Sequence, residues 1–197
     1  LDSTTEYIDA LKKRGFKVAN FEDLGEGAQY ADLVINAIYP EKTYKDNHFF
    51  GPPYFLLRDE FNEVPQKIVE PDIHEILITF GGVDPNDYTR KVLSEIDEYC
   101  HVRGIRTTVV AGFGYEKYGG LQEFEGIQVF RNVTNIAQHM QRADIIFTSA
   151  GRTTYEVASL GVPTIVLAQN QRELTHFFAS PEFGFVNLGL GSTLPDG

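Results

Sequence analysis

The stretch ADIIFTSAGRTTYEVASLGVPTIVLAQN, residues 143–170, decides the fold of this chain. Its first apolar run, residues 144–148, is typical of a buried parallel strand. Ser149-Ala150-Gly151 breaks that run, and either Thr153 or Thr154 is expected to cap the helix that follows. A turn that contains glycine and joins a strand to a helix is therefore predicted.

The second half of the stretch closes the unit. Gly161 lies where a glycine commonly ends a helix, and Pro163 follows shortly after it. Residues 164–167 (TIVL) then form another short apolar run. The whole stretch predicts strand, tight turn, helix, tight turn and strand.

The turn before this helix is suited to an anion. Helix N-termini at the carboxyl ends of parallel strands present backbone N–H groups, and phosphate is their usual ligand. Glu156, in the first turns of the helix, can accept hydrogen bonds from ribose hydroxyls. The alternative is a plain strand–helix crossover in which Glu156 is only a favourable charge near the positive end of the helix. The local pattern leaves both interpretations open.

The pattern outside this stretch continues in the same way. Apolar runs predict strands at residues 75–80, 106–111 and 126–130, and amphipathic segments predict helices at 87–99 and 136–142. A helix at 173–178 and a last strand at 184–188 are also expected. Strands that alternate with helices indicate an α/β fold with a doubly wound parallel, Rossmann-like sheet.

Three loops converge at the carboxyl ends of such a sheet, where ligands bind. They are residues 81–86, 131–135 and 149–154. Asp84 is expected to cap the helix that follows it rather than to act in catalysis. Arg152 is the best-placed single cation at the phosphate end.

The first seventy residues look like part of another domain. A helix is expected at 4–14 and strands at 16–19 and 31–36, which is too little sheet for an independent α/β domain. Residues 41–69 read as irregular, and the charged run 58–60 as a solvated face. We therefore expect residues 1–70 to be the end of an incomplete N-terminal Rossmann-like domain plus an interdomain stretch, and 71–197 to be a C-terminal nucleotide-binding domain. Both ends of the chain are expected to be cut from something longer.

Net charge, cysteine count and the length of apolar runs exclude several classes of protein. The 197 residues include 17 basic and 28 acidic ones, for a net charge of −11. This argues against a general nucleic-acid binder, and a bound nucleotide would need local donors. Cys100 is the single cysteine, so neither an internal disulfide nor a cysteine metal cluster is expected. No apolar run approaches the ~18–20 residues of a membrane span, and we expect a cytoplasmic location.

Several motifs resemble one superfamily. SAGRTTYE at 149–156, GVP at 161–163 and the glycine pair 81–82 resemble the C-terminal domain of GT-B proteins of the MurG type. GPPYFLLR at 51–58 and FGGVDPN at 80–86 resemble, more narrowly, the PseG/SpsG family of UDP-sugar hydrolases. The resemblance covers nearly the whole chain.

The resemblance implies hydrolysis of a UDP-linked diacetamido-trideoxy sugar to UDP and free sugar, for nonulosonic (pseudaminic-type) acid or surface polysaccharide synthesis, with no metal ion or other cofactor. It implies that the glycine-rich turns hold the diphosphate, that the loop after residue 131 reads uracil, that Glu156 binds ribose and that residues 169–171 face the sugar or diphosphate. The candidate substrate-binding residues are Gly81, Gly82, Asn132, Val133, Ser149, Ala150, Gly151, Arg152, Thr153, Thr154, Glu156, Gln169, Asn170 and Gln171.

The chain departs from this family in one respect. The family's catalytic histidine lies in a Gly/His motif near the start of the N-terminal domain, and no such motif occurs here. The catalytic residue is therefore expected outside this chain. Two alternatives remain: a nucleotide-sugar glycosyltransferase of the MurG kind, and a non-catalytic module that binds a nucleotide-sugar. The oligomeric state and any fusion to another domain are left open.

Overall fold

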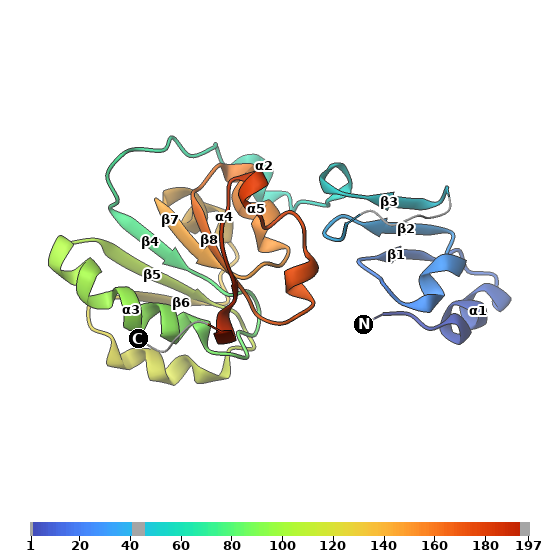
Figure 1. Ribbon diagram of the computed structural model, residues 1–197, viewed down its shortest axis with the longest axis horizontal. Coiled ribbons are helices and arrows are strands. Elements are labelled where there is room, and N and C mark those ends of the chain that lie inside the picture. The colour runs from blue at the N-terminus through green and yellow to red at the C-terminus, as the bar shows by residue number, and fades with distance from the viewer. Residues whose placement is uncertain (1, 41–45, 194–197) are drawn as a thin grey trace. The chain divides into compact units, whose positions relative to one another are not determined.

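The computed structural model describes residues 2–40 and 46–193 (Figure 1). The outermost residues of both predicted domains, and residues 41–45, lie outside the described part. Contacts divide the chain into two compact units, Leu1–Leu56 with Thr175–Phe177, and Leu57–Leu174 with Phe178–Gly197.

The first unit is a small parallel sheet with one helix. The strands β1 (Ala19–Phe21), β2 (Leu33–Asn36) and β3 (His48–Phe50) pair in that order. Helix α1 (Thr5–Lys13) begins at Thr4, whose hydroxyl accepts a hydrogen bond from the N–H of Tyr7. The helix buries Ile8 in a core that it shares with Val18 and Val34.

The predicted strand at 16–19 is wrong by three residues. After α1, Gly15 has a φ of +83°, and the N–H of Phe16 returns to the carbonyl of Leu11 at 3.3 Å. This is a helix C-terminal motif, so Phe16 is committed to the helix end and the strand starts only at Ala19.

The described part of the stretch predicted to be irregular contains a strand, a 3₁₀ turn (Pro52–Tyr54) and a short helix. Strand β3 extends the sheet next to β2, and a single helical turn, α2 (Glu60–Glu63), follows. A strand of three residues is too short to show alternation, although its aromatic residues favour a pleated surface.

The second unit holds a six-stranded sheet in which every pairing is parallel. Its strands lie in the order β6-β5-β4-β7-β8-β9. In chain order this is third, second, first, fourth, fifth, sixth, the doubly wound Rossmann order. The bounds are β4 (Glu75–Ile78), β5 (Arg106–Ala111), β6 (Gln128–Arg131), β7 (Ile145–Thr148), β8 (Thr164–Ala168) and β9 (Val186–Leu190).

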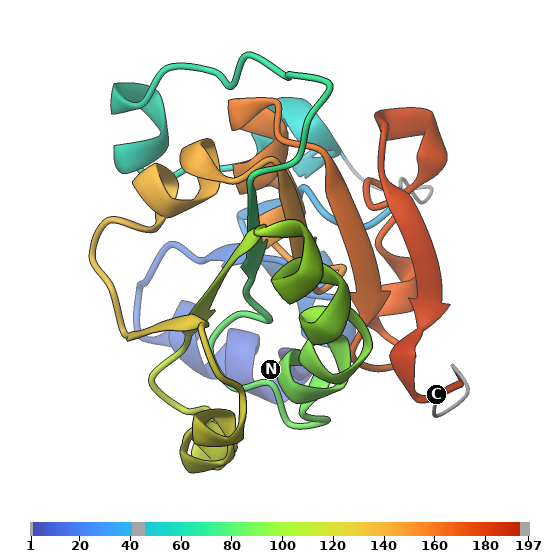
Figure 2. The same ribbon diagram turned by 90° about the vertical axis from the view of Figure 1, so that its left-hand side faces the viewer.

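Helices cover both faces of this sheet (Figure 2). On one face, α3 (Tyr88–Arg103) and the 3₁₀ segment Glu116–Glu123 pack around Leu93 and Leu121. On the other face, α4 (Ile136–Arg142) and α5 (Thr153–Leu160) share a core with α2. The predicted helices at 87–99 and 136–142 are thus confirmed, the first with a C-terminal extension.

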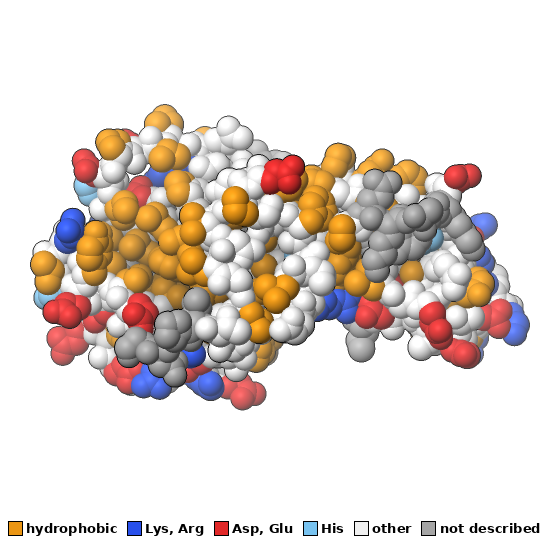
Figure 3. All heavy atoms as spheres, viewed as in Figure 1, with side chains coloured by type: hydrophobic (Ala, Val, Ile, Leu, Met, Phe, Trp, Pro, Cys, Tyr) orange, Lys and Arg blue, Asp and Glu red, His pale blue; other side chains and the backbone are white. Residues whose placement is uncertain are grey.

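Part of the sheet is less well covered. Ile145, Phe147 and Ile165 are only partly buried, and the last strand exposes Val186. Figure 3 shows apolar side chains gathered on the surface of this unit. In the described part of the chain, no helix is long and apolar enough to cross a membrane.

The helix predicted at 173–178 is wrong, because only a 3₁₀ turn, Glu173–Thr175, forms there. Thr175–Phe177 group with the first unit by their contacts. Phe178 instead stacks on Tyr155 of the second unit, with ring centroids 4.0 Å apart.

Candidate functional site

The second unit has a topological switch point between β4 and β7. These strands pair in parallel, and the chain leaves them in opposite directions along the sheet. The crevice at their carboxyl ends is the usual ligand position in doubly wound folds. Gly81-Gly82 follows β4 and Ser149-Ala150-Gly151 follows β7, so two of the predicted phosphate segments lie at this crevice.

The loop after β4 is held by its neighbour from β5. Gly81 has a φ of +75°, which favours glycine. A Cβ on Gly112 would lie 2.3 Å from the carbonyl oxygen of Gly81, so only a glycine fits at 112. The carbonyl of Gly82 accepts a hydrogen bond from the N–H of Gly114 at 2.9 Å.

Gly82 and Gly151 are glycines that the protein's own packing does not require. Neither has a positive φ. Among the described residues, no atom lies within 4 Å of a Cβ placed on Gly82. A Cβ on Gly151 would meet only the Ser149 hydroxyl at 3.5 Å and the Glu173 carboxylate at 3.9 Å, which are ordinary contacts. At both positions the absence of a side chain would let a ligand approach the backbone closely.

The start of α5 differs from the prediction. Arg152 is the N-cap residue, has helical backbone angles and makes no side-chain cap. The Thr154 hydroxyl donates to the carbonyl of Gly151 at 2.8 Å, and Thr153 is only half-buried. The expected threonine cap is therefore wrong, because three-residue turns from Gly151 and Arg152 start the helix earlier. Ser149 and Ala150 are buried and Arg152 is exposed.

Gln169 joins the end of β8 to the loop after β4. Its side-chain N–H group donates to the Asp84 carboxylate at 2.9 Å. Its side-chain oxygen accepts a hydrogen bond from the Asn86 amide at 2.8 Å. Gln169 is thus held by protein groups, whereas Asn170 and Gln171 are exposed.

The Asp84 side chain supplies the predicted cap hydrogen bonds of α3, although the N-cap position itself is Asp87. Its two carboxylate oxygens accept hydrogen bonds from the N–H groups of Tyr88 at 2.9 Å and Thr89 at 2.8 Å. It is buried, and with Gln169 it fixes the β4–α3 loop.

Sequence reasoning missed Glu173. One of its carboxylate oxygens, Oε2, accepts hydrogen bonds from the N–H of Gln169 at 2.8 Å and of Ala150 at 3.2 Å. The N–H of Glu173 donates to the Asn170 side-chain oxygen at 3.1 Å. An acid three residues after a predicted ligand residue was a signal in the sequence, but the predicted helix placed it elsewhere.

The predicted uracil loop lies two strands from β4. Asn132 has a φ of +52°, and its N–H donates to the carbonyl of Ala111 at 3.0 Å. Val133 packs against the core beneath α4 and α5, the helix that carries Glu156. This packing brings the loop to the same face of the sheet as α5.

Glu156 forms an ion pair that was not expected. Its Oε1 accepts a hydrogen bond from Nε of Arg58 at 3.0 Å, and Arg58 also contacts Glu60 at 2.8 Å. The Glu156 side chain is 14% exposed. Arg58 and Asp59 are exposed, as predicted for a solvated face, and Arg58 adds ion pairs to Glu60 and Glu156.

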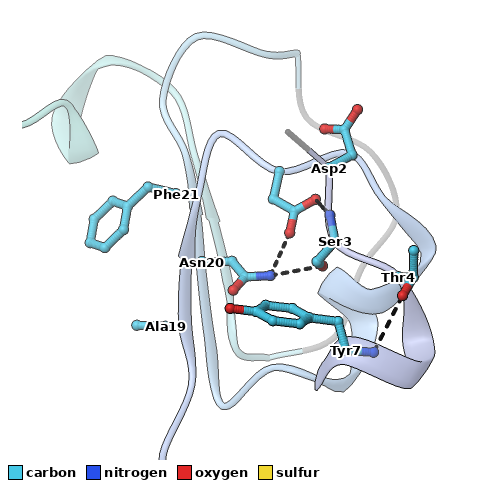
Figure 4. A pocket seen from close by; sticks show the side chains of 8 residues that line it. Asp2, Ser3, Thr4, Tyr7, Ala19, Asn20 and Phe21 are labelled. Carbon is cyan, nitrogen blue, oxygen red and sulfur yellow. Dashed lines mark hydrogen bonds between the residues drawn. The ribbon is translucent and has the colours of Figure 1, made fainter. Parts of the chain in front are cut away.

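The first unit has a hollow of its own, of about 530 Å³ (Figure 4). The Asp23 carboxylate at its wall accepts hydrogen bonds from Asn20 and from the N–H of Ser3. Asn36, at the end of β2, exchanges two hydrogen bonds with the backbone of Asp23. These polar groups hold the strand ends together, which gives Asn36 a structural role.

The described residues at the crevice therefore combine backbone amides, two open glycines and buried hydroxyl and carboxyl groups. A doubly wound sheet with these groups at its switch point can bind a phosphorylated ligand.

Comparison with known structures agrees with this architecture. The crystal structure of MurG from Acinetobacter baumannii superposes with a TM-score of 0.57 at 14% identity, over 96% of this chain and 57% of that one. The chain has a GT-B, Rossmann-like fold. At this identity the likeness to MurG concerns the fold alone.

Two curated proteins are similar in sequence. The uncharacterized protein MJ1062 of Methanocaldococcus jannaschii is 36% identical over 163 residues, which is 73% of this chain. The spore coat polysaccharide biosynthesis protein SpsG of Bacillus subtilis is 27% identical over 211 residues and matches 100% of this chain. The chain spans 33% and 62% of the lengths of these two relatives. No family model matches the sequence.

Proposed function

We propose that the second unit binds the nucleotide diphosphate of a UDP-linked sugar at the switch point between β4 and β7. The observation that carries this proposal is the pair Gly82 and Gly151. Both flank the crevice, and neither is required by backbone angle or by packing. A ligand that approaches the backbone closely gives a reason for both glycines.

The charge of the chain fits a local mode of binding. A net charge of −11 provides no general attraction for an anion. Backbone N–H groups before α5, together with the exposed Arg152, would have to supply the donors. Glu156 would accept hydrogen bonds from the ribose through the carboxylate oxygen that Arg58 does not hold.

We propose further that the whole protein hydrolyses its ligand to UDP and a free sugar in surface polysaccharide synthesis. Support comes from the sequence motifs shared with UDP-sugar hydrolases and from the SpsG relative, which is named for spore coat polysaccharide biosynthesis. In this reaction water attacks the anomeric carbon, and the bond to the diphosphate oxygen breaks. Donors at the crevice would stabilise the charge that develops on the leaving UDP.

The first experiment is a calorimetric titration with UDP, UMP, ADP and CMP, together with amide NMR shifts. Preference for UDP, with shifts confined to Gly82, Val133 and residues 149–156, would support the proposed site. Binding of all four with equal affinity, or shifts elsewhere, would contradict it. Release of UDP from a UDP-sugar in water without an acceptor would then favour hydrolysis over transfer.

A further inference from the structure

Glu173 lies where two neighbouring strands of the second unit end. Its Oε2 accepts one hydrogen bond from Gln169, directly after β8, and one from Ala150, which follows β7 after one residue. A single carboxylate oxygen therefore ties both strand ends together. Through the Ala150 hydrogen bond, Glu173 holds the backbone of the turn that leads into α5.

The second oxygen of this carboxylate faces the open glycine. Oε1 lies 3.9 Å from the position that a Cβ on Gly151 would occupy. Glu173 thus places a negative group beside the turn that we propose for the diphosphate, and it occupies the Ala150 N–H. A carboxylate oxygen that accepts hydrogen bonds from loop amides makes the same kind of contact that a phosphate oxygen would make.

The surroundings of Glu173 favour the protonated form of its carboxyl group. Burial raises the pKa of this carboxyl above its ordinary value, although the two amide hydrogen bonds act in the opposite direction. Charged residues on the neighbouring segments include Arg152 and Glu156 at the start of α5, Arg172 in its own segment, and Asp84 and Asp87 in the β4–α3 loop. His176 follows three residues later in the chain.

We propose that Glu173 is a positioning residue that holds the turn before α5 as a carboxylate and takes up a proton when a diphosphate binds. This inference rests on the proposed function. The proton comes from solvent and stays on Oε1, while Oε2 continues to accept from both amides. The protonated Oε1 then donates to a phosphate oxygen instead of repelling it.

The sign of the pH dependence follows from this scheme. Two anions at one turn oppose each other, so the diphosphate binds better to the protonated form. Affinity therefore rises as pH falls toward the pKa of Glu173. Since UDP also titrates, the quantity to compare is the difference between the wild type and a variant that cannot titrate.

The variant that isolates this charge is Glu173→Gln. The side-chain oxygen of glutamine can accept both amide hydrogen bonds, and its NH₂ group takes the place of Oε1. At neutral pH we expect this variant to bind UDP more tightly than wild type by a factor of about 5 to 150, the usual range of coupling between two sites. Glu98→Gln, an exposed position on α3, makes the same change in net charge and should leave the affinity unchanged.

Calorimetry of UDP binding in buffers of different ionisation enthalpy gives the proton count directly. Wild type and Glu98→Gln should take up more protons per UDP than Glu173→Gln, and the affinity of Glu173→Gln should vary less with pH. Equal affinity, equal proton uptake and parallel pH profiles for wild type and Glu173→Gln would overturn the role of Glu173 and leave the UDP site standing. If no variant binds UDP at any pH, the proposed function fails, and the inference about Glu173 fails with it.

Discussion

Arg58 and Glu156 lie 98 positions apart in the chain and are joined by a hydrogen bond of 3.0 Å between Nε and Oε1. Arg58 also holds Glu60, whose second oxygen accepts a hydrogen bond from the N–H of Ala137 at the start of α4. The segment before β4 is thereby tied to α4 and α5. The Arg58 contact orients the Glu156 carboxylate, which is the group that we propose for the ribose.

The first prediction concerns Glu156 itself. Replacing it with Ala should weaken UDP binding by ~1–3 kcal/mol, the scale of lost hydrogen bonds to a charged group. Arg58→Ala should weaken binding less, because the carboxylate remains but is no longer oriented. Calorimetry of both variants measures this order, with Arg103→Ala, at the end of α3, as the control for loss of an arginine. A folded Glu156→Ala protein with wild-type affinity would exclude the ribose role.

The second prediction concerns the open glycines. Gly151→Val should abolish UDP binding, because a side chain would fill the space on the crevice side. The fold itself has room for a Cβ there, so the free energy of unfolding should change by only about 1 kcal/mol.

Gly119→Val is a matched control for this experiment. Gly119 lies in the 3₁₀ segment after β5 and has no positive φ. Among the described residues, no atom lies within 4 Å of a Cβ placed on Gly119. This variant should keep its UDP affinity. If both variants bind UDP as wild type does, the turn at Gly151 does not hold the diphosphate.

Sequence patterns predicted most elements of the second unit, because the central strands β4, β5, β7 and β8 are largely buried. Residues 106–111 and 136–142 were predicted with the observed bounds, since continuous apolar runs and amphipathic spacing are strong signals there. Short elements such as β3 carry no period and were missed.

Side-chain partners were harder to predict than elements. The loops that contain Gly82 and Gly151 were expected to meet at the carboxyl ends of the sheet, and they follow the paired strands β4 and β7. The sequence could not show that Arg58 reaches Glu156 or that Glu173 reaches Ala150, because those contacts depend on how distant segments fold back. The threonine cap failed for a local reason, since the helix starts earlier and the Thr154 hydroxyl bonds to Gly151 instead.

The third prediction concerns the link between the β8 end and the loop after β4. Gln169→Ala removes hydrogen bonds to Asp84 and Asn86 and leaves these groups without that partner. We expect the free energy of unfolding to fall by about 1–3 kcal/mol, measured by urea denaturation. Gln122→Ala, at an exposed position, should change it little. A Gln169→Ala protein as stable as wild type would show that this link does not support the loop.

The last prediction concerns Asp144, at the start of β7. Burial would raise the pKa of this carboxyl, but Lys67 and the N–H groups of His74 and Glu75 together hold it below its ordinary value. The Lys67 contact is 2.6 Å, and the two N–H contacts are 2.7 and 2.9 Å. Because the pKa is lower in the folded state, this stabilisation is complete above the unfolded pKa of about 3.9 and is lost as pH falls through the folded value.

Asp144→Asn should therefore lower the free energy of unfolding at pH 7 by about 1.5–3 kcal/mol, the worth of hydrogen bonds to a charged group. The difference from wild type should shrink as the solution is acidified below about pH 4, where Asp144 itself gains a proton. Asp72→Asn, at an exposed position nearby, should not show this pH-dependent difference. Denaturation curves at several pH values measure this difference in the free energy of unfolding. If the difference between Asp144→Asn and wild type stays constant into acid, packing and not the charge of Asp144 stabilises this end of the sheet.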